Sequence, residues 1–471
     1  MADVATILSA TRGSITAPAG CGKTHLLVET VAAYDGLLPV LILTHTNAGV
    51  AALRNRFAKL GVAPSKFRLS TLDGWGLRML HAFPMRSGID SRHLLLKSPK
   101  YDYPAMREGV LNILRGQHLN DLLNSNYSML IVDEYQDCSP AQHETVVLLA
   151  EQLKTVVLGD PLQAIFDFTP EGVVDWEHDV SEAFPEIGTL DRPWRWVLAG
   201  NEELGAWLLE VRRELLKGNK IDLRNSPDCV EWVQLCGDSE DRERRLRAAN
   251  TRPQTKGGGS LIMAKWPQDQ SRFAREIPGA TKVENTDLSD LANFAESFNP
   301  AAKGAAGSLL ELATTMMTGV DRSALAARIK SISDKTNRNP PSDLELAIID
   351  FLKSPSYGKG AGILSECSRQ GGTRVFRQEM LRAAIEVLNR AEMSGGKALN
   401  ELFVELRDKA RIRGRAIPTK AVGSTLLFKG LEAEVSIILE PEAMEHERDL
   451  YVALTRGSKK LVVCSKTPLL P

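Results

Sequence analysis

The chain has 471 residues, of which 43% are hydrophobic and 25% are charged, and its formal net charge is -1. These proportions are ordinary for a globular protein able to build large cores, and the length predicts about three domains of ~150 residues. The near-zero charge excludes a global attraction to nucleic acid or membrane, so any anionic partner must be held by local basic surface.

The cysteines and the N-terminus indicate the compartment. The six cysteines form no CxxC pair and no zinc-finger spacing, which predicts free thiols in a reducing environment. The first residues lack the basic-then-apolar pattern of a signal peptide, and no apolar run is long enough to span a bilayer. We therefore expect a cytoplasmic protein with no membrane partner.

Short, unbroken apolar runs rich in β-branched residues recur along the chain, and such runs are typical of buried strands in parallel sheets. The early runs cover residues 14–18, 39–46, 128–134 and 154–160, and the late runs cover 260–266, 434–441 and 460–466. Two groups of strands predict an α/β protein with two separate sheets.

Helical patterns interrupt both groups. The segment "PSDLELAIIDFLK" begins with a capping box formed by Ser342 and Glu345, and "TRVFRQEMLRAAIEVLNRA" has apolar residues from Phe376 onward at helical spacing. Strands resume afterwards, so this region is predicted to be a helical insertion in the second unit. The expected limits are 1–84 and 126–185 for the first unit, 85–125 for its small insertion, 186–284 and 416–471 for the second unit, and 285–415 for the larger insertion.

The segment "SITAPAGCGKTHLL" predicts a strand, a loop of small residues and the start of a helix. It matches the P-loop signature, with Ala17 where the first glycine is usual. Backbone N–H groups around Gly20 and Gly22 would close on a polyphosphate at the helix N-terminus. Lys23 would neutralise the β- and γ-phosphates, and the Thr24 hydroxyl would bind Mg²⁺. The expected nucleotide-binding residues are Ala17, Pro18, Ala19, Gly20, Cys21, Gly22, Lys23 and Thr24.

An acidic cluster, "IVDEYQDCSPAQ", directly follows the predicted strand at 128–134. A P-loop leaves Mg²⁺ incompletely coordinated, and a carboxylate at the end of a neighbouring strand supplies the missing charge. Asp133 fits this role, and Glu134 fits the base that deprotonates the attacking water. The alternative is a solvated acidic turn without any catalytic role.

Eight segments in the family order resemble superfamily 1 helicases of the UvrD/Rep/PcrA type. After the P-loop they are "LTHTNAGVAALRNRF", "STLDGWGLRML", "VDEYQDCSPAQ", "LGDPLQAIFDF", "RPWRW", "STLLFKGLEAEV" and "RDLYVALTRGSKKL". The resemblance implies two RecA-like P-loop domains with parallel sheets, each carrying a helical insertion, and an ATP hydrolase that uses Mg²⁺.

The resemblance also implies roles for single residues. Gln163 would contact the γ-phosphate, Glu432 would hold the ribose, and Arg195 and Arg456 would act as arginine fingers on the transition-state charge. Surface ion pairs are the alternative for the two arginines. The resemblance places DNA contacts at Thr44, His45, Asn47, Thr71 and Phe168.

Several positions depart from the family pattern. The lead-in "MADVATILSATRG" has no adenine-reading glutamine, His45 replaces an aromatic residue, and Phe168 replaces the base-stacking tryptophan. Phe168 could stack a base or lie in the core, and the same alternatives hold for Trp75 and Trp194. Adenine selection and the DNA contacts are therefore expected to differ from those of the family.

The implied function is translocation on single-stranded or tailed duplex DNA, with 3′ to 5′ polarity, in DNA repair or anti-phage defence. Short family members accompany a nuclease subunit in anti-phage systems such as Gabija. The alternative is an ATPase subunit that senses DNA and regulates a partner nuclease without processive unwinding. The sequence predicts no particular oligomeric state.

Overall fold

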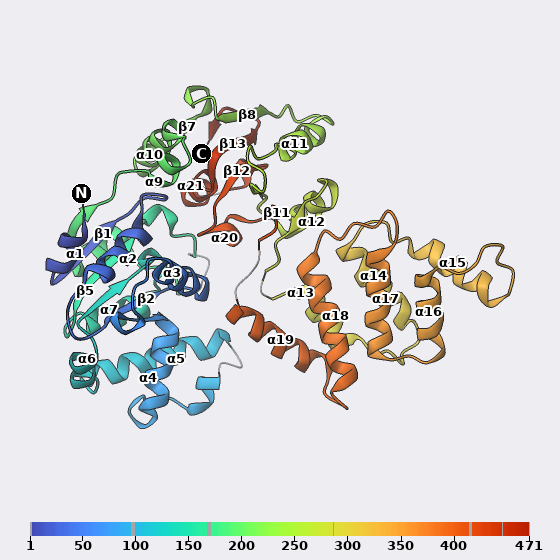
Figure 1. Ribbon diagram of the computed structural model, residues 1–471, viewed down its shortest axis with the longest axis horizontal. Helices are drawn as coiled ribbons and strands as arrows, with labels where there is room; N and C mark the ends of the chain where they lie inside the picture. Colours follow the sequence, from blue (N-terminus) through green and yellow to red (C-terminus); the bar gives the residue numbers. More distant parts are fainter. Residues whose placement is uncertain are drawn as a thin grey trace.

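The computed structural model describes residues 2–95, 99–166, 171–285, 287–413, 417–444 and 446–470. Two six-stranded parallel sheets, each covered by helices, confirm the predicted α/β fold (Figure 1). A separate group of helices lies beside the second sheet. Within the described residues, no helix combines the length and the apolar character needed to cross a membrane.

The first sheet has the strand order β3-β2-β4-β5-β1-β6. Its strands are β1 (Arg12–Thr16), β2 (Val40–Thr44), β3 (Phe67–Thr71), β4 (Met129–Val132), β5 (Lys154–Gly159) and β6 (Glu186–Thr189). All pairs are parallel, so the carboxyl ends of the strands meet along one edge. The sheet extends to Thr189, four residues beyond the expected limit at 185, because β6 pairs with the P-loop strand β1.

Alternate residues of the first sheet enter two hydrophobic cores, because successive side chains of a strand point to opposite faces. Val40 and Ile42 join the core under α2 and α3, whereas Leu41 and Leu43 join the core under the helices of the opposite face. The flanking helices are α1 (Val4–Ser9), α2 (Lys23–Ala33), α3 (Asn47–Lys59), α4 (Leu72–Ala82), α5 (Pro99–Arg115), α6 (Asn120–Asn126), α7 (Pro140–Leu149) and α8 (Ser181–Ala183).

The expected small insertion at 85–125 packs directly onto the first sheet. Met106, Val110 and Ile113 of α5 share one hydrophobic core with Leu130 and Val132 of β4. This segment therefore contributes to the covering layer of the sheet.

The second sheet has the order β10-β11-β9-β12-β13-β8. Its strands are β8 (Val230–Gln234), β9 (Ser260–Met263), β10 (Thr281–Lys282), β11 (Lys420–Gly423), β12 (Ala433–Ile438) and β13 (Gly457–Ser465), and β7 (Ile221–Asp222) pairs with β14 (Leu469–Leu470) outside it. The surrounding helices are α9 (Trp194–Leu198), α10 (Glu202–Leu216), α11 (Asp241–Ala249), α12 (Pro267–Glu276), α20 (Thr425–Phe428) and α21 (Glu447–Leu454).

Seven helices form the larger insertion, which we call the helical lobe (residues 287–413; Figure 1, right). They are α13 (Ser289–Ser297), α14 (Ala305–Met316), α15 (Arg322–Ser333), α16 (Asp343–Lys353), α17 (Tyr357–Arg369), α18 (Gln378–Met393) and α19 (Leu399–Arg413). The predicted capping box of Ser342 and Glu345 is present at the start of α16. Every buried residue of the lobe's core lies between Leu288 and Leu406, so the lobe has a hydrophobic core of its own.

One short segment of the lobe nevertheless belongs to the second sheet. Phe376 was expected on a helix, but α18 begins only at Gln378, and the Phe376 ring lies in the core with Ile262 and Val422. The carbonyl of Phe376 accepts a hydrogen bond of 2.7 Å from the N–H of Lys282 in β10. The ring enters the sheet's core because its backbone extends the pairing next to β10.

An adjacent buried ion pair strengthens this attachment. The Arg377 guanidinium donates to both carboxylate oxygens of Glu284 at 2.6 and 2.8 Å, and to Asp290 at 2.6 Å. Arg377 and Glu284 are both buried, so each charge depends on the other for compensation. The lobe is therefore anchored to the second sheet by residues 376–377 as well as by the two chain crossings.

We expect Phe376→Ala to weaken the second sheet and leave the lobe's core intact. Removing a buried ring costs about 3–5 kcal/mol in a closely packed core. Hydrogen exchange should show that loss as faster opening at β9 and β11, with unchanged protection in α14 and α17. Phe376→Leu, which keeps most of the volume, is the control. Equal protection of β9 in the alanine variant and the wild type would contradict this role.

Candidate functional site

The P-loop joins β1 to α2 at the carboxyl edge of the first sheet. Gly20 and Gly22 have φ values of 73° and 90°, in the left-handed region that favours glycine, and Gly22 caps α2. The 11-residue helix α2 begins at Lys23, directly after the loop. Its first backbone N–H groups and the loop together form the kind of helix N-terminus that binds phosphate.

The Lys23 ammonium lies between two buried carboxylates. Its Nζ is 2.7 Å from Glu134 Oε1 and 3.2 Å from Asp133 Oδ1. The two carboxylates are thus the partners of this buried ammonium. Burial opposes the charge of Lys23, but the two carboxylates raise its pKa. A permanently charged ammonium at the first residue of α2 fits a polyphosphate ligand.

Glu134 is held in an uncommon backbone conformation. Its φ of 56° and ψ of 41° are left-handed, which costs free energy for a residue with a side chain and is often found at functional sites. Gln136 Nε2 donates to Glu134 Oε2 at 2.6 Å. Burial alone would raise the pKa of Glu134, but the ammoniums of Lys23 and Lys429 outweigh it and lower the pKa to about 2. Glu134 is thus a carboxylate at every physiological pH.

Asp133 and Thr24 are the residues that could hold a divalent cation beside the loop. Burial raises the pKa of Asp133, although Lys23 opposes the shift, so the positive charge of Lys23 compensates this carboxylate only in part. Within the described residues, no group of three or more His, Cys, Asp or Glu side chains is arranged to bind a metal ion by itself. Mg²⁺ accepts one or two protein oxygens together with substrate phosphates, which fits this pair.

Arg195 and Glu432, predicted separately for the site, are bonded to each other. The Arg195 Nε donates to Glu432 Oε2 at 2.7 Å, and its Nη1 donates to the carbonyl of Thr455 at 2.6 Å. The backbone N–H of Arg195 donates to the carbonyl of Gly20 in the P-loop at 3.0 Å. The structure therefore places α9 against the loop, with Arg195 and Glu432 paired beside it.

Arg456 is buried with its donors occupied by neighbouring oxygens. It donates to the carbonyls of Val452 and Leu431 and to Thr455 Oγ1, at 2.8, 3.1 and 2.8 Å. Burial, followed by the nearby charge of Arg195, lowers the pKa of Arg456 to about 9. The predicted alternative of a surface ion pair does not describe this residue, which is 1% exposed.

A hydrogen-bonded chain connects Glu134 to the second unit. Gln136 bonds Glu134 through its amide nitrogen and accepts from the Asp160 N–H, at 3.1 Å, through its amide oxygen. The Asp160 carboxylate accepts from Gln163 Nε2 at 3.0 Å and from Arg212 of α10 at 3.1 Å. Asp160 thus binds both Arg212 and Gln163, the residue that was predicted to contact the γ-phosphate.

The pair of Lys429 and Asp137 forms a second bridge between the units. The Lys429 ammonium, from the KGLE segment, donates to both Asp137 oxygens at 2.5 Å and also to the Gln163 carbonyl. Burial raises the pKa of Asp137 to about 6, and Lys429 opposes this shift. Both residues lie within motifs visible in the sequence, but their pairing was not predicted, since 292 positions separate them.

Tyr451 and Trp194 lie near the P-loop. The sequence predicted no role for Tyr451 and left two alternatives for Trp194. The Tyr451 hydroxyl accepts a hydrogen bond of 3.1 Å from the Ala19 N–H. Trp194 lies beside Gly22, where an added Cβ would be 3.0 Å from its Cδ1, and it stays partly exposed with Arg192 stacked on its ring. Trp75, by contrast, is fully buried in the core.

The predicted DNA contacts lie at the carboxyl ends of β2 and β3, which are neighbours in the sheet. Thr44 Oγ1 and His45 Nδ1 are buried and have no hydrogen-bond partner among the described residues, and burial lowers the pKa of His45 to about 4. Asn47 is exposed at the start of α3, whereas Thr71 Oγ1 accepts from the Gly74 N–H at the start of α4. Phe168 lies outside the described residues.

Residues 95–170 match the UvrD/REP helicase N-terminal domain family, which supports the resemblance over a stretch that includes Glu134 and Gln163. No curated protein matches the chain in sequence. Among solved structures, the chain is similar to the Pif1 helicase of Candida albicans, with 17% identity, a TM-score of 0.32, and coverage of 59% of this chain and 53% of that one. It is also similar to the arterivirus nonstructural protein 10 helicase in complex with DNA, with 13% identity, a TM-score of 0.28, and coverage of 56% and 50%. The matches span about half the length of each of these structures.

The pKa of Asp137 leads to a pH-dependent prediction. Because burial raises its pKa from 3.8 to about 6, the folded state binds a proton that the unfolded state does not bind between those values. Burial outweighs the attraction to Lys429, so the net cost of the charged carboxylate is present at pH 8 and disappears as the pH falls through about 6. We expect the Asp137 carboxyl group to make the folded chain less stable at pH 8 than at pH 5.

Urea denaturation at pH 5 and pH 8 measures the difference in the free energy of unfolding. Asp137→Asn has no titrating group at this position, so the difference between the two pH values should become smaller than in the wild type. Asp290→Asn, which removes a half-exposed carboxylate of the lobe, serves as the control. An Asp137→Asn variant that retains the wild-type pH dependence would show that the Asp137 carboxyl group does not cause it.

Proposed function

We propose that the chain is an ATP-dependent DNA helicase or translocase of the superfamily 1 type. The observation that carries this proposal is the buried Lys23 ammonium, which lies against Asp133 and Glu134 while Arg195 of α9 contacts the same P-loop. The family match over residues 95–170 supports the same class of enzyme.

The binding of ATP and Mg²⁺ would change the partners of Lys23, Asp133 and Glu134. The β- and γ-phosphates would replace the carboxylates as partners of Lys23, which frees Glu134 to accept a proton from water. Thr24 and Asp133 would hold Mg²⁺, which neutralises charge on the phosphates when bound. The depressed pKa of Glu134 is caused by Lys23 and Lys429, so a phosphate that draws Lys23 away would raise its basicity.

The pair of Arg195 and Glu432 would open in the same step. Arg195 would turn from Glu432 to the developing charge on the γ-phosphate, and Glu432 would then be free to accept from the ribose hydroxyls. Arg456 would have to exchange three neighbouring oxygens for phosphate, and a phosphate would supply the negative charge that this buried guanidinium lacks among its hydrogen-bond partners. Pairing within the protein would thus hold these groups ready in the absence of nucleotide.

Movement on DNA would follow from the bridges between the units. Gln163, Asp137 and Asp160 contact groups of the second unit, so a change at the γ-phosphate would reach both sheets. Single-stranded DNA would cross the edge at Thr44, His45, Asn47, Thr71 and Phe168. The proposed polarity is 3′ to 5′, and the proposed setting is DNA repair or anti-phage defence, where a nuclease subunit would be the partner.

A second candidate is a DNA-sensing ATPase that regulates a nuclease without processive unwinding. The packing of residues 85–125 favours it, because α5 lies on the first sheet and shares its core. The described residues of that segment therefore form no separate projecting body that could help to split a duplex. The two candidates share the nucleotide chemistry and differ in strand separation.

We expect Mg²⁺-dependent ATP hydrolysis that single-stranded DNA accelerates. Glu134→Gln should bind nucleotide but hydrolyse it at least ~100-fold more slowly, the usual contribution of a general base. Glu29→Gln, which alters an exposed residue of α2 paired only with His25, should hydrolyse ATP as the wild type does. The measurement is phosphate release with and without DNA, alongside nucleotide affinity.

Unwinding of a duplex with a single-stranded tail distinguishes the two candidates. Strand separation that requires ATP supports the helicase, whereas DNA-stimulated hydrolysis without separation supports the sensor. Full turnover in Glu134→Gln would remove Glu134 from the proposed mechanism, and the absence of any DNA effect would exclude both candidates.

We expect weak discrimination among ATP, GTP and dATP. The lead-in contains no glutamine to read adenine, and Trp194 beside Gly22 can stack any base, because every base has a π-face. Trp194→Ala should weaken the binding of all three nucleotides by about 1–3 kcal/mol, and Trp194→Phe should weaken their binding less. Competition assays decide the matter, and strict use of ATP would mean that another residue reads the base.

A further inference from the structure

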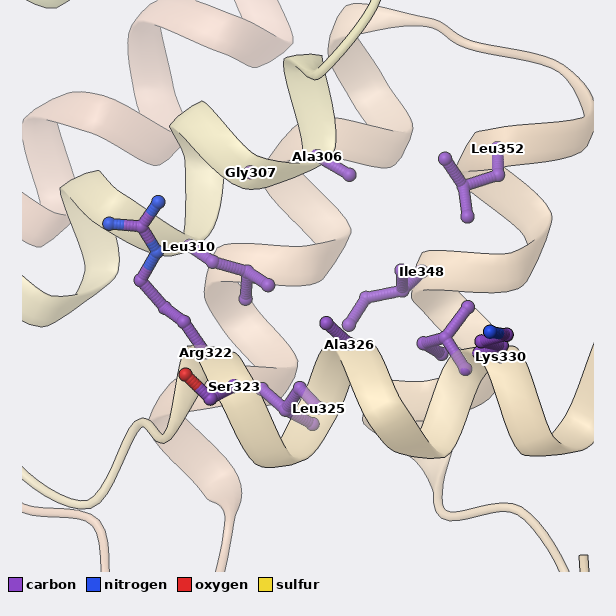
Figure 2. Close-up of a pocket in the computed structure, with 11 residues that line it drawn as sticks. Ala306, Gly307, Leu310, Arg322, Ser323, Leu325, Ala326, Lys330, Ile348 and Leu352 are labelled. Atoms are coloured by element: carbon purple, nitrogen blue, oxygen red, sulfur yellow. The ribbon is translucent and has the colours of Figure 1, made fainter.

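A groove crosses the helical lobe between α14, α15 and α16 (Figure 2). Its volume is about 560 Å³, within the range of pockets that bind ligands. Leu310 and Gly307 line it from α14, Leu325 from α15, and Ile348 and Leu352 from α16. The groove lies far along the chain from the P-loop and belongs to a body with its own core.

The groove exists because α15 is only loosely packed against the lobe. One residue of α15, Leu325, is buried, whereas six residues of α14 and four of α16 are buried. The apolar faces of α14 and α16 are therefore incompletely covered, and Leu352 remains 54% exposed at the end of the groove. An added Cβ at Gly307 would meet no atom within 4 Å, which shows that the floor is open there.

The charged residues that line the groove have a single sign. Its lining includes two cations, Arg322 and Lys330 of α15, and no acidic residue. They lie eight residues apart, or about 12 Å along the helix, and Figure 2 shows them at opposite ends of the row of apolar side chains. Glu311 lies 3.6 Å from Arg322, a long contact between exposed groups that contributes little in water. Over the described part of the chain, no carboxylate lies within 4.0 Å of the Lys330 ammonium.

We propose that this groove binds a short amphipathic helix of a partner protein, with apolar anchors on one face and acidic residues at both ends. Side chains at i, i+3, i+4 and i+7 of such a helix would lie on Leu310, Ile348 and Leu352. Its carboxylates would pair with Arg322 and Lys330, which sets the direction and the salt dependence of binding. The helix would complete the packing that α15 leaves open.

The site is independent of the nucleotide chemistry. The groove residues belong to the lobe's own core or its surface, and none of them contacts the P-loop or the bridges between the sheets. Loss of the groove should therefore leave the proposed hydrolysis unchanged. The failure of one proposal would not imply the failure of the other.

The test uses the full chain and a fluorescein-labelled synthetic helix of about 16 residues, with leucines at i, i+3, i+4 and i+7 and glutamates at both ends. A matched peptide carries lysines in place of the glutamates. Gly307→Trp fills the floor of the groove, and Gly362→Trp on α17, where an added Cβ also meets no atom within 4 Å, is the control outside it. Fluorescence anisotropy measures binding, and thermal melting checks that each variant is folded.

We expect the acidic peptide to bind the wild type and Gly362→Trp equally, and Gly307→Trp at least tenfold more weakly. Lys330→Glu should weaken the binding of the acidic peptide by roughly tenfold and strengthen the binding of the lysine peptide. Equal binding of both peptides to the wild type, or unchanged binding to a folded Gly307→Trp variant, would overturn the proposal. The proposal would also be wrong if the wild type bound the dye anilinonaphthalene sulfonate, Gly307→Trp did not, and neither bound a peptide. The groove would then be a small-molecule pocket.

Discussion

The buried ammonium of Lys23 is the charge on which the arrangement of the site depends. It compensates Asp133 and Glu134, and without it these two carboxylates at the end of a buried strand would lose the cation that lies within 3.2 Å of both. One ammonium faces two carboxylates, and burial still raises the pKa of Asp133, so the compensation is incomplete. In the proposed function, a polyphosphate with more negative oxygens than these carboxylates provide would compete for the same ammonium.

Charged contacts also connect the carboxylates of this site to the second unit. Lys429 lowers the pKa of Glu134 and binds Asp137, so one cation of the second unit acts on two carboxylates of the first. Arg212 reaches Asp160, whose N–H is bonded to Gln136 and thus to Glu134. Each bridge joins a charged group to a partner that also contacts the phosphate-binding region. A change of charge at Lys23 would consequently alter the attraction between the units.

The lobe combines independence with firm attachment. Its core contains no residue from either sheet, which is what a body able to fold by itself requires. Phe376 and Arg377, however, lie in or against the second sheet, and the Arg377 guanidinium binds both carboxylate oxygens of the buried Glu284. The lobe should therefore follow the motion of the second sheet, carrying with it the apolar groove beside α15.

The sequence by itself determined the two α/β units, the P-loop and the acidic strand end, because each of these depends on residues close together in the chain. Unbroken apolar runs reveal buried strands, and the spacing of Gly22, Lys23 and Thr24 reveals a loop that enters a helix. The capping box of Ser342 and Glu345 was predictable for the same reason. These features need no knowledge of what lies opposite them.

Only the tertiary structure decided which side chains meet across long stretches of sequence. The pairs of Lys429 with Asp137 and Arg195 with Glu432 join positions separated by more than 200 residues, and no local pattern encodes such a distance. Phe376 follows a helical pattern but enters the core of a sheet, because burial of a ring outweighs local helix preference. Trp75 and Trp194 look alike in sequence, yet one is buried and the other lies beside Gly22, since exposure depends on neighbours that folding alone supplies.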